Sequence, residues 1–365
     1  MKTSVCHITS VHSWNDIRIF QKECVSLANF GYDVHLLVAN STFEGEAKGV
    51  NVHNCDIGKL SRVERMRKSA KLMKDKAFLL DADLYHIHDP ELLPLGKALI
   101  KKSKKVIFDA HEDAAADLLE KDLFPKPVRG IMSGFYNWYE KKTIKSFSGL
   151  VSVSEEITKS FNHPLSETIK NYPVLSLFSK IQRNKDEENP FIIYAGGLTR
   201  VRGIKEIISS MEYLPDYKLV LAGPFDSDSY KKECMELKQW SQVNYVGYVS
   251  LERVYELLSG ASLGFTMLYP TEGHKHSLPI KTFEYMAAGI PVLMTDMPYW
   301  REIFGDYGNY ANVYDPKEIG QKAKALMDKE DNGQIQKAKE MVFNKFDWEK
   351  EAVKLDCFYQ KVLKS

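Results

Sequence analysis

Short apolar runs alternate with amphipathic segments along most of the chain. Near the N-terminus, an apolar run at 4–9 precedes apolar side chains at helical spacing within 19–28, and a second apolar run follows at 34–39. Asn15 or Asp16 is suited to cap that helix. The pattern predicts a strand–helix–strand unit, and its almost wholly apolar strands are typical of a parallel sheet covered on both faces.

The same alternation fills the rest of the chain in two blocks. The first block predicts further strands at 84–88, 105–109 and 150–154. The second predicts strands at 191–195, 218–222, 244–246, 261–267 and 291–295, with helices at 203–211 and 279–288. Strands that alternate with helices imply parallel sheets with right-handed crossovers, so we expect an α/β protein with two Rossmann-like, doubly wound domains facing across a cleft.

A polar stretch between the blocks sets the predicted domain boundaries. We expect one domain at 1–172, a linker at 173–188 and a second domain at 189–346. The last segment, 347–365, carries apolar residues at helical spacing and predicts an amphipathic helix. Ligands of such sheets bind beyond the carboxyl ends of the strands, so the loops there are where binding chemistry is expected.

Composition narrows the range of functions. The formal net charge of +1 and the hydrophobic fraction of 44% are typical of a globular protein without a general affinity for nucleic acid. Five scattered cysteines without a CxxC pair indicate a reduced protein without disulfides. No signal peptide is expected at the N-terminus, and no apolar run reaches the roughly 18 residues of a membrane span. We therefore expect a cytoplasmic protein.

The segment 276–292 carries the strongest candidate chemistry. Pro279 suits a first helical position, with Ser277 or Leu278 as the cap, and the free N–H groups of the first turn could bind a diphosphate. Glu284 lies about a turn and a half further along, where its carboxylate could accept hydrogen bonds from two vicinal hydroxyls of a ribose. On the helix pattern alone, a surface helix with a solvated Glu284 is the alternative.

Other polar residues follow predicted strands. Asp16 and Arg18 follow the first strand, where they either contact substrate or cap the helix and bond to each other. His86 and His88 lie on one face of another strand, and Asp89 follows them. A metal pair needs a third ligand at sensible spacing, which this stretch lacks, so a hydrogen-bonded wall of the cleft is the preferred interpretation.

Two Asp-x-Asp stretches, 81–83 and 226–228, look like the metal-binding motif of metal-dependent glycosyltransferases, which have a different fold. The first precedes a predicted strand, and the second lies in a loop. We expect no catalytic metal at either stretch, and no cofactor.

The segment that ends in 283–292 resembles the signature of glycosyltransferase family 4, a group of retaining enzymes with the GT-B fold. The resemblance implies that Glu284 binds the ribose of a nucleotide. The family's first signature glutamate, which lies near the donor sugar, falls on His276. The resemblance also covers 108–112, where His111 matches a histidine at the cleft floor near the reactive carbon, and 346–349, which is similar to the family's last helix, crossing back to the first domain.

The loop at 194–203 resembles the family's glycine-containing phosphate loop. Its usual lysine falls on Arg202, which would bind the diphosphate, and its usual arginine falls on Gly197, after Gly196. Arg200 is close enough in sequence to substitute for that arginine. Without a metal, the leaving charge needs fixed positive partners, and Arg202, Arg200, Lys281 and the helix N-terminus would supply them.

The resemblance implies a metal-independent glycosyltransferase of bacterial surface-polysaccharide synthesis, such as capsule or lipopolysaccharide. It would move a sugar from a nucleotide diphosphate sugar to a hydroxyl of a glycan or lipid-linked glycan. A UDP-sugar is preferred to a GDP-sugar as the expected donor. A nucleotide-sugar epimerase or hydrolase and a catalytically silent partner subunit are the alternatives. Basic amphipathic stretches at 62–74 and 123–138 either lie on the inner face of the cytoplasmic membrane or are solvated helix faces.

Overall fold

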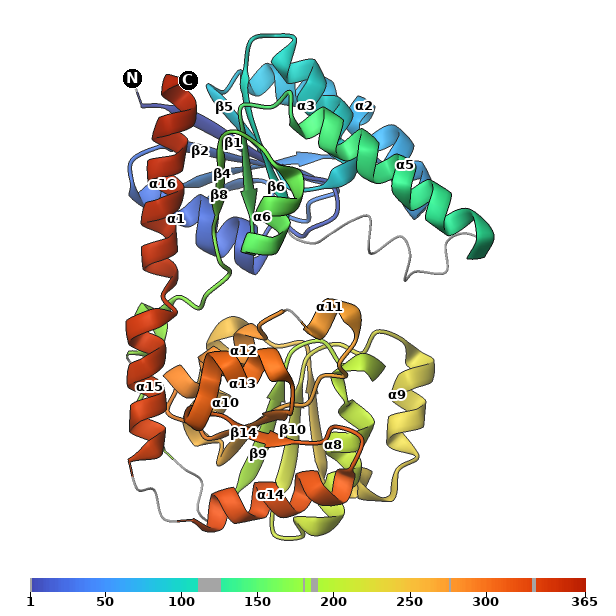
Figure 1. Ribbon diagram of the computed structural model, residues 1–365, viewed down its shortest axis with the longest axis vertical. Coiled ribbons are helices and arrows are strands. Elements are labelled where there is room, and N and C mark those ends of the chain that lie inside the picture. Colours follow the sequence, from blue (N-terminus) through green and yellow to red (C-terminus); the bar gives the residue numbers. More distant parts are fainter. Residues whose placement is uncertain (1, 111–125, 180, 185–189, 276, 330–332) are drawn as a thin grey trace. The chain divides into compact units, whose positions relative to one another are not determined.

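The computed structural model describes residues 2–110, 126–179, 181–184, 190–275, 277–329 and 333–365. It divides into two compact units (Figure 1). Unit 1 consists of Met1–Asn171 together with Trp348–Ser365, and unit 2 consists of Tyr172–Asp347. The chain therefore leaves unit 1 once and returns to it for the last helix.

Unit 1 is built on an eight-stranded sheet in the order β3-β4-β2-β1-β5-β6-β7-β8. Its strands are β1 (Ser4–Thr9), β2 (Asp33–Ala39), β3 (Gly45–Ala47), β4 (Val50–Cys55), β5 (Leu84–Ile87), β6 (Lys105–Ala110), β7 (Gly149–Ser152) and β8 (Ser166–Thr168). All pairs are parallel except β3 with β4. The strand order reverses between β1 and β5, which is the switch point where doubly wound sheets bind ligands.

The helices of unit 1 follow its strands. They are the π-helix η1 (Ile17–Cys24), α1 (Val25–Asn29), α2 (Arg62–Leu80), η2 (Pro90–Leu92), α3 (Leu93–Ile100), α5 (Lys126–Ile144), α6 (Glu155–Phe161) and α16 (Trp348–Lys364). The helix predicted after the first strand begins with the wider π turns, which in other proteins are frequent at functional sites. Asp16 caps it, with Oδ1 accepting from the backbone N–H groups of Arg18 and Ile19 at 2.8 and 2.9 Å.

The C-terminal helix α16 is part of unit 1 (Figure 1). The indole of Trp348 donates to the Ser26 hydroxyl at 3.0 Å, and Glu351 accepts from the Lys170 N–H at 2.9 Å. Leu355, Phe358, Tyr359 and Val362 are buried along one face. The helix predicted at 347–365 is therefore present and packs against the N-terminal block of the chain.

Unit 2 has six parallel strands in the order β11-β10-β9-β12-β13-β14. They are β9 (Phe191–Ala195), β10 (Lys218–Ala222), β11 (Val243–Gly247), β12 (Leu263–Thr266), β13 (Val292–Thr295) and β14 (Asn309–Ala311). The order reverses between β9 and β12, so the switch point lies there. With its counterpart in unit 1, this sheet forms the predicted pair of Rossmann-like domains.

Helices surround the sheet of unit 2. They are α7 (Leu175–Phe178), η3 (Arg200–Arg202), α8 (Ile204–Ser210), η4 (Met211–Tyr213), α9 (Asp228–Met235), η5 (Lys238–Gln242), α10 (Leu251–Gly260), α11 (Glu272–Lys275), α12 (Ile280–Ala287), α13 (Pro298–Phe304), η6 (Gly305–Tyr307), α14 (Pro316–Asp328) and α15 (Gln334–Lys345). None of the helices in the described ranges is long and apolar enough to cross a bilayer.

The segment predicted as a linker, 173–188, differs from that prediction. It contains α7, whose Leu175 and Phe178 are buried in the core of unit 2, so its first part is folded. The guanidinium of Arg183 donates to backbone carbonyls at the end of α10, including that of Ser259 at 3.0 Å. The charged residues of this stretch lie at 180–190, after α7, so they do not indicate a linker over its first part.

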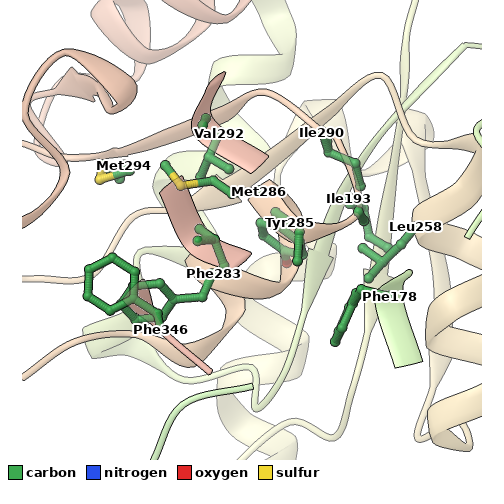
Figure 2. Packing of buried hydrophobic residues seen from close by; sticks show 14 of the residues in the cluster. Phe178, Ile193, Leu258, Phe283, Tyr285, Met286, Ile290, Val292, Met294 and Phe346 are labelled. Atoms are coloured by element: carbon green, nitrogen blue, oxygen red, sulfur yellow. The ribbon is translucent and has the colours of Figure 1, made fainter. Parts of the chain in front are cut away.

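The core of unit 2 fixes α12 against the sheet (Figure 2). Phe283 and Tyr285 are 1% and 0% exposed, and full burial of such side chains contributes about 1.5–3 kcal/mol each. The Tyr285 hydroxyl accepts from the Ala195 N–H at the end of β9, at 2.8 Å. Gly264 of β12 makes room for the ring, because a Cβ there would lie 2.4 Å from it. These contacts hold the start of α12 at the switch point.

Candidate functional site

Two segments of unit 2 meet at its switch point. Gly196 and Gly197 follow β9, and α12 follows the loop after β12. Gly196 has a φ of +133°, a conformation that other residues rarely adopt. A Cβ on Gly196 would lie 3.0 Å from Lys281 Nζ and 3.4 Å from Arg202 Nη1, and a Cβ on Gly197 would lie 3.7 Å from the same Arg202 atom. The glycine loop is thus lined by two cationic side chains.

The Lys281 ammonium is the most unusual group of this site. Its nitrogen is buried, lies 3.6 Å from the centre of the Tyr194 ring, and has no hydrogen-bond partner in the part of the chain that is described. Burial lowers the pKa of Lys281 well below its ordinary value, Arg202 lowers it further, and Glu284 opposes both. A buried ammonium without hydrogen bonds is unfavourable, so a bound anion would stabilise this arrangement.

The side chain of Tyr194 contacts the glycine loop. Its hydroxyl donates to the Gly197 carbonyl at 3.1 Å, and burial raises its pKa to about 12, with Arg202 acting in the opposite direction. The sequence analysis assigned no role to Tyr194. Its position near the end of a predicted strand, just before two glycines, was the feature that could have indicated a place in the site.

The start of α12 differs in detail from the prediction. The helix begins at Ile280, and Pro279 precedes it in an extended conformation, so Pro279 is the cap position and not the first helical residue. Leu278 packs against the core, and the exposed Ser277 accepts from the Trp300 indole with its carbonyl oxygen at 2.8 Å. Glu284 is half-buried on the same helix as Lys281.

The side chain of Arg200 contacts Glu233 and Tyr230. Its Nη2 atom is 2.8 Å from both carboxylate oxygens of Glu233, and its guanidinium lies over the Tyr230 ring at 4.9 Å. The predicted roles of His111 and His276 fall on positions outside the described residues, and they stay predictions.

In unit 1, Arg18 is buried in an ionic network instead of facing solvent. Its guanidinium donates to both carboxylate oxygens of Asp109 at 3.0–3.1 Å, and its Nε lies 3.0 Å from Glu23 Oε1. Burial raises the pKa of Glu23 well above its ordinary value, Arg18 opposes the shift, and Asp109 adds to it. Arg18 was expected to contact substrate or to bond to Asp16, but its side chain binds these two carboxylates.

Three histidines of unit 1 pack together beneath the C-terminal helix. His7 Nδ1 lies 2.9 Å from His88 Nε2, and the Tyr359 hydroxyl lies 2.6 Å from His86 Nδ1 and 3.1 Å from His7 Nε2. Burial lowers the pKa of His7 and of His86 well below the ordinary value, and the neighbouring histidines lower both further. His86 and His88 share one face, as predicted, but both are buried, so their side chains form an internal network and not an accessible wall.

A second set of polar residues lies at the carboxyl ends of β1 and β5. Asp89 Oδ2 accepts from the Thr9 hydroxyl at 2.8 Å and from the Ser10 N–H at 2.6 Å. His12 lies 3.4 Å from Asp16 and 3.5 Å from Asp89. Burial lowers the pKa of His12, but the two carboxylates outweigh it and raise the pKa above its ordinary value. Sequence reasoning assigned no role to His12, although its spacing of four residues from Asp16 pointed to the pair.

Family models match both units. The model described as "Glycosyltransferase Family 4" matches residues 22–167, and the one described as "Glycosyl transferases group 1" matches residues 177–345. The chain is a GT-B glycosyltransferase of the group 1, family 4 kind. No curated protein sequence matches it. The two matches correspond to units 1 and 2, so the glycine loop and α12 belong to the group 1 half of the glycosyltransferase.

Solved structures share the fold of this glycosyltransferase at low sequence identity. Sucrose-phosphate synthase from Thermosynechococcus elongatus is 15% identical with a TM-score of 0.78, and the match covers 100% of both chains. A glycosyltransferase from Rickettsia africae is 13% identical with a TM-score of 0.69, over 100% of this chain and 99% of that one. HepE of Anabaena in complex with UDP and glucose is 14% identical with a TM-score of 0.67, over 98% and 100%.

Other features of the glycosyltransferase lie apart from this chemistry. The Asp81 and Asp83 carboxylates contact Lys104 and the Ser4 N–H, and Ser227 caps α9, so both Asp-x-Asp stretches have local structural roles. A cavity in unit 2 is lined by Ile290, Val292 and Asn309 among others. It opens where β13 and β14 begin, at the opposite end of the sheet from Gly196.

Proposed function

We propose that this glycosyltransferase binds the diphosphate of a UDP-linked sugar at Gly196, Arg202 and Lys281. The observation that carries the proposal is the buried Lys281 ammonium, which has no hydrogen-bond partner among the described residues and lies beside Arg202 at the switch point of unit 2. A diphosphate supplies the charge and the acceptors that these groups lack. The structure of HepE in complex with UDP and glucose supports UDP as the nucleotide.

The proposed reaction is transfer of the sugar, with retention at the anomeric carbon, to a hydroxyl of a glycan or lipid-linked glycan in surface-polysaccharide synthesis. Breaking the bond from sugar to phosphate leaves negative charge on the diphosphate. Arg202 and Lys281 are fixed before the reaction by Tyr194 and the glycine loop, and prearranged charge of this kind stabilises the transition state without a metal ion. We propose that Glu284 binds the ribose and that His111 orients the sugar.

A donor screen followed by a transfer assay tests the proposal. Thermal unfolding of the full chain is measured with uridine, guanosine, adenosine and thymidine diphosphates and their sugars, because a ligand that binds only the folded protein raises its stability. We expect the uridine compounds to give the largest shift. UDP release from the preferred donor should be slow alone and fast with a glycan extract. Interconversion of the free donor would point to an epimerase, and no binding and no release would point to a silent partner subunit.

A peripheral membrane contact is proposed for unit 1, on helices α2 and α5. Phe135 and Trp138 of α5 are 63% and 56% exposed, and Lys142 lies over the Trp138 ring. Exposed aromatic side chains beside basic residues are typical of surfaces that bind anionic membranes. Co-sedimentation with vesicles of anionic phospholipid should fall several-fold in Phe135→Ser/Trp138→Ser, and equal binding of the variant and the natural protein would refute this contact.

A further inference from the structure

One carboxylate oxygen in unit 1 faces three imidazoles. Glu23 Oε2 lies 3.8 Å from His7 Nδ1, 3.9 Å from His86 Nδ1 and 3.9 Å from His88 Nε2. One ligand atom from each of the four residues lies within 4.8 Å of the others. Ligand atoms around a tetrahedral zinc ion are about 3.3–3.4 Å apart, since the bonds are about 2.0–2.1 Å long. The Glu23 oxygen would thus need to approach the His7 and His88 nitrogens by about half an ångström, and the most widely spaced pair of ligand atoms would need to close by up to about 1.4 Å.

The donor set fits a transition metal. Imidazole nitrogens and a carboxylate suit divalent zinc and its neighbours, whereas calcium and magnesium bind to sets of oxygen atoms. All four side chains are buried, and within the described ranges Glu23 Oε2 and His86 Nε2 have no hydrogen-bond partner, whereas Glu23 Oε1 lies 3.0 Å from Arg18 Nε. Buried polar atoms are normally hydrogen-bonded, so two such atoms in one cluster need an explanation.

The charge of the surroundings also favours a cation. Arg18 makes three hydrogen bonds to Asp109 and one contact to Glu23, so two buried carboxylates share one guanidinium.

The outer contacts resemble those around metal-bound histidines, which usually donate their second ring N–H to a nearby oxygen. His7 Nε2 and His86 Nδ1 lie 3.1 and 2.6 Å from the Tyr359 hydroxyl. His88 Nδ1 lies 3.5 Å from Asp109 Oδ2. His7 Nδ1 and His88 Nε2, the nitrogens that face Glu23, lie 2.9 Å apart, and His86 Nε2 has no hydrogen-bond partner among the described residues.

We infer that unit 1 binds one divalent transition-metal ion, with zinc as the best fit, between His7, Glu23, His86 and His88. Four protein ligands in a buried position leave no open coordination site, so the ion is structural and takes no part in sugar transfer. It joins β1, η1 and β5, and through Tyr359 it orders α16. The inference is independent of the proposed donor site, which lies in unit 2.

Metal analysis of the purified full chain, expressed in zinc-supplemented medium, tests the inference. We expect one zinc per chain in the natural protein and loss of the metal in Glu23→Gln, which keeps the shape of the side chain and removes its charge. The matched control is His53→Ala. His53 forms a half-buried pair with His35 at 2.9 Å outside the cluster, so the control should keep the metal. Tyr359→Phe should keep the ligands and weaken zinc affinity by about 10- to 100-fold.

Because a ligand variant can fail to fold, a second measurement uses the natural chain alone. The protein is unfolded in guanidinium with a chelator and refolded with one equivalent of Co²⁺ or without metal. The visible absorption bands of tetrahedral Co²⁺ and a higher unfolding temperature are expected only in the sample with metal. Absence of metal after purification, together with no bands and no thermal shift after refolding, would overturn the inference and leave a metal-free network with a proton on Glu23.

Discussion

Lys281→Met removes the charge that unit 2 buries beside Tyr194 while keeping a long, flexible and apolar side chain. Two roles for Lys281 predict opposite results. If the ammonium served a buried ion pair, removing it would destabilise the protein by about 3–5 kcal/mol. The described residues offer its nitrogen no hydrogen bond, only the face of the Tyr194 ring. Removing the buried ammonium should stabilise the protein by about 1–3 kcal/mol. Losing its contact with the Tyr194 ring should destabilise the protein by about 0.5–2 kcal/mol, so the two effects nearly cancel.

We therefore expect Lys281→Met to leave the unfolding free energy within about 1 kcal/mol of the natural value. UDP binding should weaken by about 10²-fold, which corresponds to about 2.7 kcal/mol. At a UDP concentration of about 100 times the natural Kd, the natural protein gains about 2.7 kcal/mol of stability. At the same concentration, the variant would gain about 0.4 kcal/mol.

The assay is thermal unfolding with and without UDP, paired with titration calorimetry. Lys218→Met is the matched control, because Lys218 is exposed at the start of β10, at the other end of the sheet from Gly196. It should match the natural protein in both measurements. A Lys281→Met protein that loses about 3 kcal/mol of stability and binds UDP with unchanged affinity would show that the ammonium is structural, and the proposed anion site would have to be abandoned.

Three further predictions concern the same site. Burial and Arg202 depress the pKa of Lys281, so UDP binding should be accompanied by proton uptake at pH values above that depressed pKa. The affinity for UDP should fall as the pH rises toward the ordinary pKa of lysine. Calorimetry in buffers of different ionisation enthalpy measures the proton uptake. In the same window the unfolded chain holds more protons, so unfolding free energy should rise with pH in the natural protein and not in Lys281→Met. Gly196→Ala should weaken UDP binding at least about tenfold, whereas Gly197→Ala, with more room and no positive φ, should retain it; equal effects would contradict the geometry. Arg202→Ala should reduce UDP affinity by about 10²-fold and Arg200→Ala by less than about twofold, because Arg200 pairs with Glu233; the reverse order would return Arg200 to the diphosphate.

The sequence was informative where local pattern determines structure. The run at 191–195 and the two glycines after it predicted a strand and a loop at its carboxyl end, and both are present. The fold places the start of α12 beside that loop because β9 and β12 are neighbours, which alternation of strands and helices indicates only in general terms. The direction of Arg200 depends on a single turn, η3, and on the left-handed Gly203 that ends it, and neither is readable from composition.

The histidine cluster shows why spacing along the chain failed. His86 and His88 lacked a third ligand nearby in sequence, and that absence argued against a metal. β1 pairs with β5, which places His7 opposite His86 although the two residues are 79 positions apart in sequence, and η1 brings in Glu23. Glu23 lies within an amphipathic segment, where a charged residue is normally read as solvent-facing. A contact that depends on strand order cannot be found by searching a short window.

The two units place opposite charges at the same position of their sheets. At the β9–β12 switch point, Lys281 and Arg202 outnumber the Glu284 carboxylate that opposes them. Near the β1–β5 switch point, the Asp109 and Glu23 carboxylates share one guanidinium, and Asp89 follows β5 with His12 as a neighbour. A diphosphate bound in unit 1 would add negative charge beside these carboxylates, whereas in unit 2 its negative charge offsets two cations. The charge of each switch point therefore favours unit 2 for the proposed diphosphate site.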